Sequence, residues 1–188
     1  GSNANSANSF VMDSNTSSLT VTNTITIVPS TIGANARNNV LNVSSGYIIC
    51  NGLNSSNSGI ANKDCNISIS TGTLDVNGNA TLGNNAAQNA FTFTGGGTFR
   101  VSGAFTGGGN ITSALGNLEY YGGAQIMNNL FTGYNNLIIS NTGIKTLGAT
   151  STINGNLIIS GTAQLDATAT PFNISVAGNW SVTSTNAD

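Results

Sequence analysis

The sequence predicts an all-β protein, a single-stranded parallel β-helix (a solenoid) of roughly eight coils with 19 to 26 residues each. Residues 137–140 (LIIS) return unchanged 20 residues later at 157–160. The step at 155–157 (GNL) returns 23 residues later at 178–180 (GNW). Short apolar runs that return at such intervals, with Gly, Asn, Ser and Thr between them, are typical of a solenoid.

A second repeat occupies the first half of the chain. Residues 72–78 (GTLDVNG) align with 97–103 (GTFRVSG), and 46–52 (GYIICNG) fit the same frame. Each unit is a glycine, a strand with two inward apolar positions, and a glycine turn, because side chains alternate between the two faces of a strand. Stacked coils of three short strands would bury a continuous apolar side, with glycines at the turns and asparagine amides paired between coils.

Composition limits the classes of function. The 188 residues are 38% apolar and only 5% charged, with a net charge of −2. Disordered chains usually combine low hydrophobicity with high net charge, so we expect a folded domain. The four basic residues are scattered, which argues against nucleic-acid binding. No apolar run approaches the roughly 18 residues that cross a bilayer, so we expect no membrane insertion.

In chain order, residues 1–18 are rich in Asn and Ser, and we expect them to be loosely ordered or to cap the first coil. Residues 19–188 are predicted to form the β-helix, which we interpret as a fragment of a longer repeat protein. Alternating, β-branched runs bounded by turn residues predict the early strands. These strands are expected at 19–22, 24–28, 40–43, 47–50 and 66–69.

Three charged residues fall at equivalent outward positions of successive coils. Arg100 aligns with Asp75 in the repeat, and Glu119 lies 19 residues after Arg100. Stacked rungs would place them in an outward column of acid, base and acid, with Arg100 in the middle. We expect a solvated structural column in which each pair adds only about 0.2–1 kcal/mol.

Cys50 and Cys65 are the only cysteines, and two interpretations remain open. They are free buried thiols, or they form a disulfide that closes the intervening loop, which an extracellular location would favour. Two cysteines without any histidine cannot supply the four ligands of a zinc site, so we predict no metal site.

Three tyrosines also allow two interpretations. Tyr47, Tyr121 and Tyr134 are candidates for stacking on sugars, but ordinary strand positions explain them as well. Trp180 aligns with the inward Leu157, so we expect it in the core.

Residues for catalysis are scarce. With no histidine, acid–base chemistry would fall to six carboxylates, and no two of them are close in the sequence. The one predicted stack holds Arg100 between its two acids, which would keep both ionised. We therefore predict no enzymatic activity, no catalytic residues and no cofactor.

The motifs at 121–125 (YGGAQ), 134–137 (YNNL), 143–147 (GIKTL), 154–157 (NGNL) and 177–180 (AGNW) resemble a repeat of very large surface proteins of Bacteroidota. Residues 65–182 carry the resemblance, whereas 1–64 match only in style. It implies a β-helical module of an adhesin-like protein that is exported by the type IX secretion system. It implies no catalytic residues.

From the repeats and the resemblance we expect a non-enzymatic structural or adhesive module, a stalk or fibre, at the extracellular cell surface. Expected partners are neighbouring repeats of the parent chain, other copies of the chain in end-to-end or fibre assembly, or a surface polysaccharide. The alternatives are a carbohydrate-binding β-helix, which needs outward tyrosines on adjacent coils, and a β-helix polysaccharide lyase or hydrolase, which needs two carboxylates within about 9 Å without an arginine between them.

Overall fold

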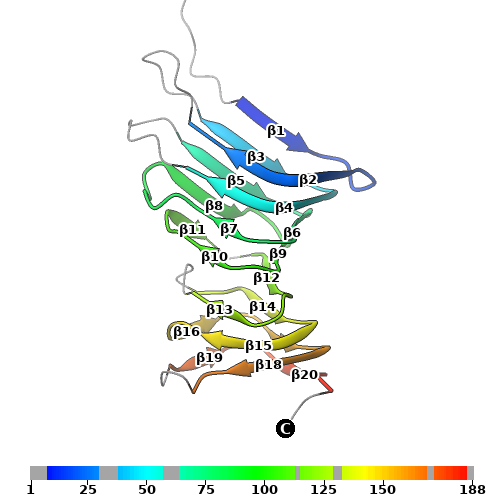
Figure 1. Ribbon diagram of the computed structural model, residues 1–188, viewed down its shortest axis with the longest axis vertical. Coiled ribbons are helices and arrows are strands. Elements are labelled where there is room, and N and C mark those ends of the chain that lie inside the picture. The colour runs from blue at the N-terminus through cyan, green and yellow to red at the C-terminus, as the bar shows by residue number, and fades with distance from the viewer. Residues whose placement is uncertain are drawn as a thin grey trace, which may run out of the picture.

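The chain winds into a parallel β-solenoid, seen side-on in Figure 1. A computed structural model describes residues 8–29, 38–56, 64–112, 115–128, 133–168 and 172–185. These residues form strands and turns without any α-helix, and every strand pairing among them is parallel. The predicted all-β solenoid is therefore confirmed. No helix long and apolar enough to cross a membrane occurs in the described part of the chain.

One face of the solenoid, the first face, runs along the whole structure. Its strands belong to a single sheet and stack in chain order, each pairing with the next one along the axis. They are β2 (Ser18–Ile27), β4 (Tyr47–Ser55), β6 (Thr73–Val76), β9 (Thr98–Val101), β12 (Asn117–Tyr120), β14 (Asn136–Ile139), β17 (Leu157–Ile159) and β20 (Trp180–Val182).

The other strands complete each coil. In the N-terminal half, β7 (Ala80–Thr81) and β10 (Phe105–Thr106) extend the far end of β4. A five-stranded sheet closes that half with β1 (Asn8–Met12), β3 (Asn39–Val43), β5 (Cys65–Ile69), β8 (Asn89–Phe93) and β11 (Asn110–Thr112). In the C-terminal half, two smaller sheets contain β13 (Gln125–Met127), β15 (Thr142–Leu147) and β18 (Thr162–Asp166), and β16 (Ser151–Ile153) and β19 (Ile174–Val176).

The core is one continuous column of apolar side chains inside the coils. On the first face, Leu74, Phe99, Leu118, Leu137 and Leu157 lie on consecutive rungs and are at most 1% exposed. Their spacing follows the two repeats seen in the sequence. The repeats therefore exist because each copy supplies the same inward position of the next coil.

Aromatic rings fill the core of the N-terminal half. Phe91 packs edge-on against Phe93 and Phe99, with ring centroids 5.5 and 4.9 Å apart. Phe105 lies 5.0 Å from Phe99. Such tilted contacts suit the quadrupoles of the rings. The wider coils of this half thus enclose a phenylalanine cluster, whereas the first face of the shorter C-terminal coils stacks Leu and Ile.

Tight turns explain the glycines that open many units. A Cβ at Gly97 would lie 2.6 Å from the Gly72 carbonyl oxygen, and one at Gly178 would lie 2.4 Å from that of Gly155. Both distances are shorter than any real contact, so successive turns approach too closely for a side chain. Glycine is required there by the neighbouring rung.

An asparagine ladder runs beside these glycines in the C-terminal half. Asn136 Nδ2 donates to Asn117 Oδ1 (2.9 Å), and Asn136 Oδ1 accepts from the backbone N–H of Asn156 (2.8 Å). Asn156 Oδ1 accepts in turn from the N–H of Asn179 (2.9 Å). Pairing of asparagine amides between coils, predicted from the sequence, is confirmed at Asn117 and Asn136.

Three details differ from the sequence-based expectations. The solenoid has about six turns, slightly fewer than the predicted eight. The runs at 19–22 and 24–28 form one strand, β2, whose register with β4 shifts between Val21 and Thr24. Trp180 does pair with Leu157, but it is 58% exposed because no described rung covers β20.

The N-terminal segment also contributes to the solenoid. Strand β1 lies within the stretch 1–18 that the sequence predicts to be loose or capping, and it pairs with β3 over five residues. The parallel pairing satisfies its backbone groups and brings Phe10 beside Leu41. Among the described residues, the first rung therefore begins at Asn8.

Candidate functional site

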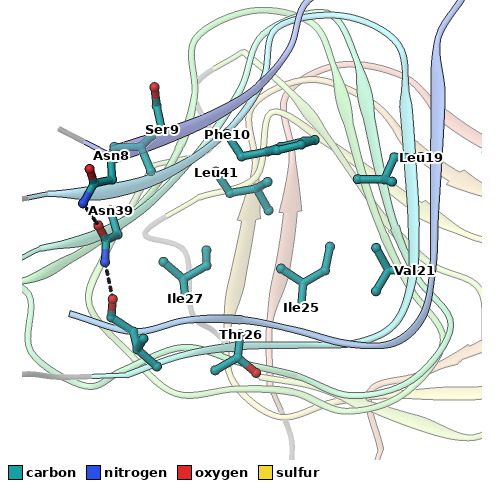
Figure 2. A pocket seen from close by; sticks show the side chains of 12 residues that line it. Asn8, Ser9, Phe10, Leu19, Val21, Ile25, Thr26, Ile27, Asn39 and Leu41 are labelled. Atoms are coloured by element: carbon teal, nitrogen blue, oxygen red, sulfur yellow. Dashed lines mark hydrogen bonds between the residues drawn. The ribbon is translucent and has the colours of Figure 1, made fainter. Parts of the chain in front are cut away.

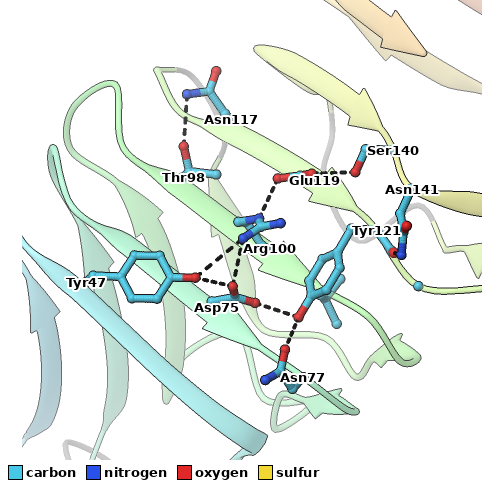
Figure 3. A network of polar contacts seen from close by, with 12 residues as sticks. Tyr47, Asp75, Asn77, Thr98, Arg100, Asn117, Glu119, Tyr121, Ser140 and Asn141 are labelled. Atoms are coloured by element: carbon cyan, nitrogen blue, oxygen red, sulfur yellow. Dashed lines mark hydrogen bonds and ion pairs between the residues drawn. The ribbon is translucent and has the colours of Figure 1, made fainter. Parts of the chain in front are cut away.

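A network of interacting polar side chains lies on the outer side of the first face (Figure 3). It contains Tyr47 of β4, Asp75 of β6, Arg100 of β9, Glu119 of β12, and Tyr121, which directly follows β12. We call these five residues the outward ion network. The inward positions that flank them in each strand point into the core, so the alternation of a strand directs these side chains outward.

Arg100 is the centre of the network. Its neighbours in register are Asp75 on one side and Glu119 on the other. Arg100 Nη1 lies 2.8 Å from Asp75 Oδ2, and Arg100 Nε lies 2.6 Å from Glu119 Oε2. The structure therefore brings together the three charged residues that the repeat alignment places in one column, with the base between the two acids.

Two tyrosines enclose Asp75. The Tyr121 hydroxyl donates to Asp75 Oδ1 (2.6 Å), and the Tyr47 hydroxyl donates to Asp75 Oδ2. The Arg100 guanidinium carbon lies 4.5 Å from the centroid of the Tyr121 ring, a cation–π contact. Although Tyr47 and Tyr121 lie on different coils, both hydroxyls reach the same carboxylate.

The network is much less solvated than the sequence suggests. Asp75 is 3% exposed, although its side chain points away from the core. The side chain of Glu119 is 14% exposed and that of Arg100 is 30% exposed. The expected solvated column was wrong in this respect, because tyrosine rings from neighbouring coils cover it. The sequence positions of the three charged residues do not show which side chains of other coils lie over them.

The tyrosine and arginine pKa values follow from this enclosure. Burial, followed by the hydrogen bond to Asp75, raises the pKa of both Tyr47 and Tyr121 above the ordinary value for a phenol. For Arg100, burial acts to lower the pKa, but the hydrogen bond and charge of Glu119, aided by Asp75, outweigh it and raise the pKa. Both phenols stay neutral donors at physiological pH, and Arg100 stays charged.

The arrangement leaves little capacity for acid–base chemistry. Asp75 is occupied by two phenols and a guanidinium, and Glu119 by Arg100 and the Ser140 hydroxyl. Arg100 lies between the two carboxylates, unlike the open carboxylate pair of a glycosidase. Among the described residues, no group of three or more potential metal ligands is found. The network can tie coils together more readily than it can transform a ligand.

Tyr134, the third tyrosine proposed for sugar stacking, is not part of this surface. It is 1% exposed, and its hydroxyl donates to the Asn128 carbonyl oxygen at 3.4 Å. Burial raises its pKa to about 12. Stacking of Tyr134 on an external sugar is therefore contradicted, because its ring fills the core.

The two cysteines are free, so the disulfide interpretation was wrong. Cys50 lies on β4 and Cys65 on β5, strands of different sheets, and each is 1% exposed. Burial raises the pKa of both thiols. They occupy inward positions as small apolar side chains, as the other interpretation proposed.

Lys145 is a buried cation that sequence reasoning missed. It is 0% exposed, and its ammonium donates to the carbonyl oxygens of Gly122 (2.6 Å), Thr142 (2.5 Å) and Ser140 (3.4 Å). In the part of the chain that the structure describes, the ion pairs are those of Arg100. Burial lowers the pKa of Lys145. The available signal was Leu147, because residues two apart in a strand share a face and Leu147 is buried.

Gln125 lies beside Lys145 in register and holds the same turn. Its Oε1 accepts from the Gly122 N–H (2.9 Å), and its Nε2 donates to the carbonyl oxygens of Val101 (3.1 Å) and Gly103 (2.8 Å). We call Gly122, Gln125 and Lys145 the buried corner. Its side chains replace the hydrogen bonds that the turn backbone would otherwise make with water.

Comparisons of the chain with protein-family models, with curated proteins and with solved structures find no match.

Proposed function

We propose that this chain is a non-enzymatic structural module of an elongated bacterial surface protein, a stalk or adhesive fibre that acts outside the cell. The main support is the outward ion network, whose charged groups are all engaged with one another across successive coils. The continuous core and parallel ladders also suit a part that carries tension. The resemblance of residues 65–182 to repeats of Bacteroidota surface proteins supports export by the type IX secretion system.

The mechanical role follows from how the coils are connected. A solenoid is approximately a sum of unit stabilities and interfaces between neighbours, so each coil resists separation through its contacts with the next. Arg100 connects β6, β9 and β12 by two ion pairs, and Ser140 extends the connection to the end of β14. These contacts hold the middle of the solenoid, where the longer coils give way to the shorter ones.

Pulling a single molecule by its two ends with optical tweezers tests this proposal. We expect the extension to rise in discrete steps of about one coil, as neighbouring units separate in turn. Arg100→Met should lower the force of the steps that involve the middle coils and leave the others unchanged. A smooth extension without steps, starting at the lowest forces, would contradict a mechanical role.

A carbohydrate-binding module is the second candidate. The observation in its favour is that the half-buried side chains of Tyr47 and Tyr121 converge on one outward patch. Against it, Arg100 already lies over the Tyr121 ring, and Asp75 engages both hydroxyls. No specific observation favours a polysaccharide lyase or hydrolase, because Arg100 lies between the two carboxylates of the patch.

A glycan array separates the two candidates. Our proposal predicts no specific sugar binding to the wild-type chain. A signal that is lost in Tyr47→Ala and kept in Tyr47→Phe would instead favour carbohydrate binding, because Phe keeps a ring for stacking and loses only the hydroxyl. A signal that survives both substitutions would direct the search to another surface.

A further inference from the structure

The coils of the solenoid are not joined equally along its length. In the N-terminal half, two successive coils are joined on three sides, because β6 pairs with β9, β7 with β10 and β8 with β11. In the C-terminal half, β14 likewise pairs with β17, β15 with β18 and β16 with β19. Each of these two interfaces therefore contains three parallel ladders.

One interface in the middle of the solenoid is different. Among the described strands, the coil of β9, β10 and β11 is joined to the next coil by the pairing of β9 with β12 alone. Strands β10 and β11 lie at the ends of their stacks, and β13 lies at the end of a separate sheet. Figure 1 shows β11 above and β13 below the level of β12. We call the strands up to β11 the N-terminal block, those from β12 onward the C-terminal block, and the interface between them the junction.

Each block is closed by strands on several sides. In the N-terminal block, Figure 2 shows Phe10 of β1 and Leu41 of β3 across the interior from Ile25 of β2. In the C-terminal block, the first two coils are joined by β12 with β14, by β13 with β15, and by a bridge between Tyr134 and Ile153. Contacts within each block thus come from several sides of a coil, whereas at the junction the described strands pair on the first face alone.

Side-chain amides take the place of a ladder between β10 and β13. Gln125 Nε2 donates to the carbonyl oxygens of Val101 (3.1 Å) and Gly103 (2.8 Å). Asn128 Nδ2 donates to the carbonyl oxygen of Phe105 (3.2 Å). Backbone carbonyl groups shielded from water need donors, so these two side chains of the C-terminal block satisfy groups that a paired strand would otherwise satisfy.

On the first face, side chains of the outward ion network supplement the ladder of β9 with β12. Arg100 Nε lies 2.6 Å from Glu119 Oε2, and the Tyr121 hydroxyl donates to Asp75 Oδ1 (2.6 Å). Both contacts cross the junction, because Arg100 and Asp75 belong to the N-terminal block and their partners to the C-terminal block. The junction therefore depends on a few side chains, whereas ladders of backbone groups join the coils within a block.

We propose that the junction is a built-in joint, at which the solenoid opens while both blocks remain folded. The stability of a solenoid is approximately a sum of unit terms and nearest-neighbour interfaces, so the interface with the fewest ladders opens at the lowest cost. Cooperative units that open one before another are general in proteins. In a stalk, opening the joint would lengthen the module and let it bend without unfolding either block. This inference rests on the proposed structural function and identifies the place where the module yields.

Hydrogen exchange of single amides, followed by NMR at increasing urea concentrations, tests the joint. Equivalent backbone N–H groups donate across three successive interfaces, those of Thr98 and Ser102 within the N-terminal block, Asn117 and Tyr121 at the junction, and Asn136 and Ser140 within the C-terminal block. We expect protection against exchange to be about tenfold lower for the junction pair than for the other two pairs. It should also depend less steeply on urea, because opening the joint exposes less surface than unfolding a block.

A variant of the bridging amide makes the test specific. Gln125→Met removes the amide that crosses the junction but keeps most of the side-chain volume. Protection at Asn117 and Tyr121 should fall about tenfold further, as expected for the loss of one or two hydrogen bonds, and the other two pairs should not change. Asn79→Ala is the matched control. It removes a side-chain bond to the Ala104 N–H (2.9 Å) inside the N-terminal block, so it should leave the junction pair unchanged.

Circular dichroism establishes that each variant is folded, and Asn128→Ala replaces Gln125→Met if the latter is not. Equal protection and equal urea dependence at all three interfaces would overturn the inference. So would opening of either block interface before the junction, or an effect of Gln125→Met that is spread equally over the three interfaces. Stepwise extension in the pulling experiment would still support the structural function in those cases, and a smooth extension would contradict that function even if the joint exists.

Discussion

Lys145 is fully buried and the Arg100 side chain is 30% exposed, and the chain compensates the two charges in different ways. Arg100 lies on the outer side of the first face between two carboxylates, at 2.8 and 2.6 Å. Lys145 lies inside the solenoid and is held by the backbone carbonyl oxygens of Gly122, Ser140 and Thr142. Both arrangements connect neighbouring coils: the first does so through opposite charges, whereas the second joins the Gly122 turn to residues 140–142 of the next coil through neutral carbonyl groups and retains the cost of burying a cation.

The comparison predicts its largest effect at Arg100. Arg100→Met keeps much of the side-chain volume but leaves Asp75 buried without its cation. We expect the free energy of unfolding to fall by about 3 kcal/mol, the low end for removing one partner of a buried pair, because Arg100 is partly exposed. Urea denaturation followed by circular dichroism measures it.

Arg100→Lys provides the matched control. It keeps the charge but loses the planar fork that reaches both acids, so an intermediate loss is expected. A loss below about 0.5 kcal/mol for Arg100→Met would mean that the network behaves like an exposed surface pair.

A smaller effect is expected at the tyrosines that cover Asp75. Tyr121→Phe removes the hydrogen bond to the carboxylate but keeps the ring against Arg100, and Tyr47→Phe does the same from the other side. Each should lower the free energy of unfolding by about 1.5 kcal/mol, a typical value for a hydrogen bond to a charged group. If both substitutions are neutral in urea denaturation, the phenols do not support Asp75.

Lys145→Met should cost less than Arg100→Met, about 1 kcal/mol. The substitution leaves the Gly122 and Thr142 carbonyls without their donor, but it also removes the penalty of a buried ammonium, so the two effects largely offset. Urea denaturation of both variants side by side measures the difference. A Lys145 variant less stable than the Arg100 variant would reverse the comparison.

The smallest effect concerns pH. Because the pKa of Lys145 is lowered in the folded state, the unfolded chain binds more protons between that value and the ordinary 10.5. Stability should therefore rise with pH in this window, and Lys145→Met should abolish the rise. Tyr47 and Tyr121 act in the opposite sense. Their raised pKa values keep them protonated in the folded state above pH 10, where the unfolded phenols ionise, so stability is lost there.

The sequence predicted those features that repeat from coil to coil. The spacing of residues 72–78 and 97–103 placed Asp75 beside Arg100, and the inward columns followed from strand alternation. It could not predict that Asp75 is buried. The rings of Tyr47 and Tyr121 that cover Asp75 belong to other coils, and the sequence does not show where the path of the chain places these rings. Nor did it predict Lys145 inside the core, since its partners are backbone carbonyls that have no signature in the sequence.

A double-mutant cycle on Asp75 and Arg100 tests most directly whether the outward ion network is a structural connection between coils. Asp75→Asn, Arg100→Met and the double variant are compared with the wild type by urea denaturation. The account predicts that the double variant is more stable than the sum of the two single losses implies, by about 1.5 kcal/mol or more, because each single variant leaves a charge without its partner. Additive losses would show that the two side chains do not stabilise each other and would contradict it.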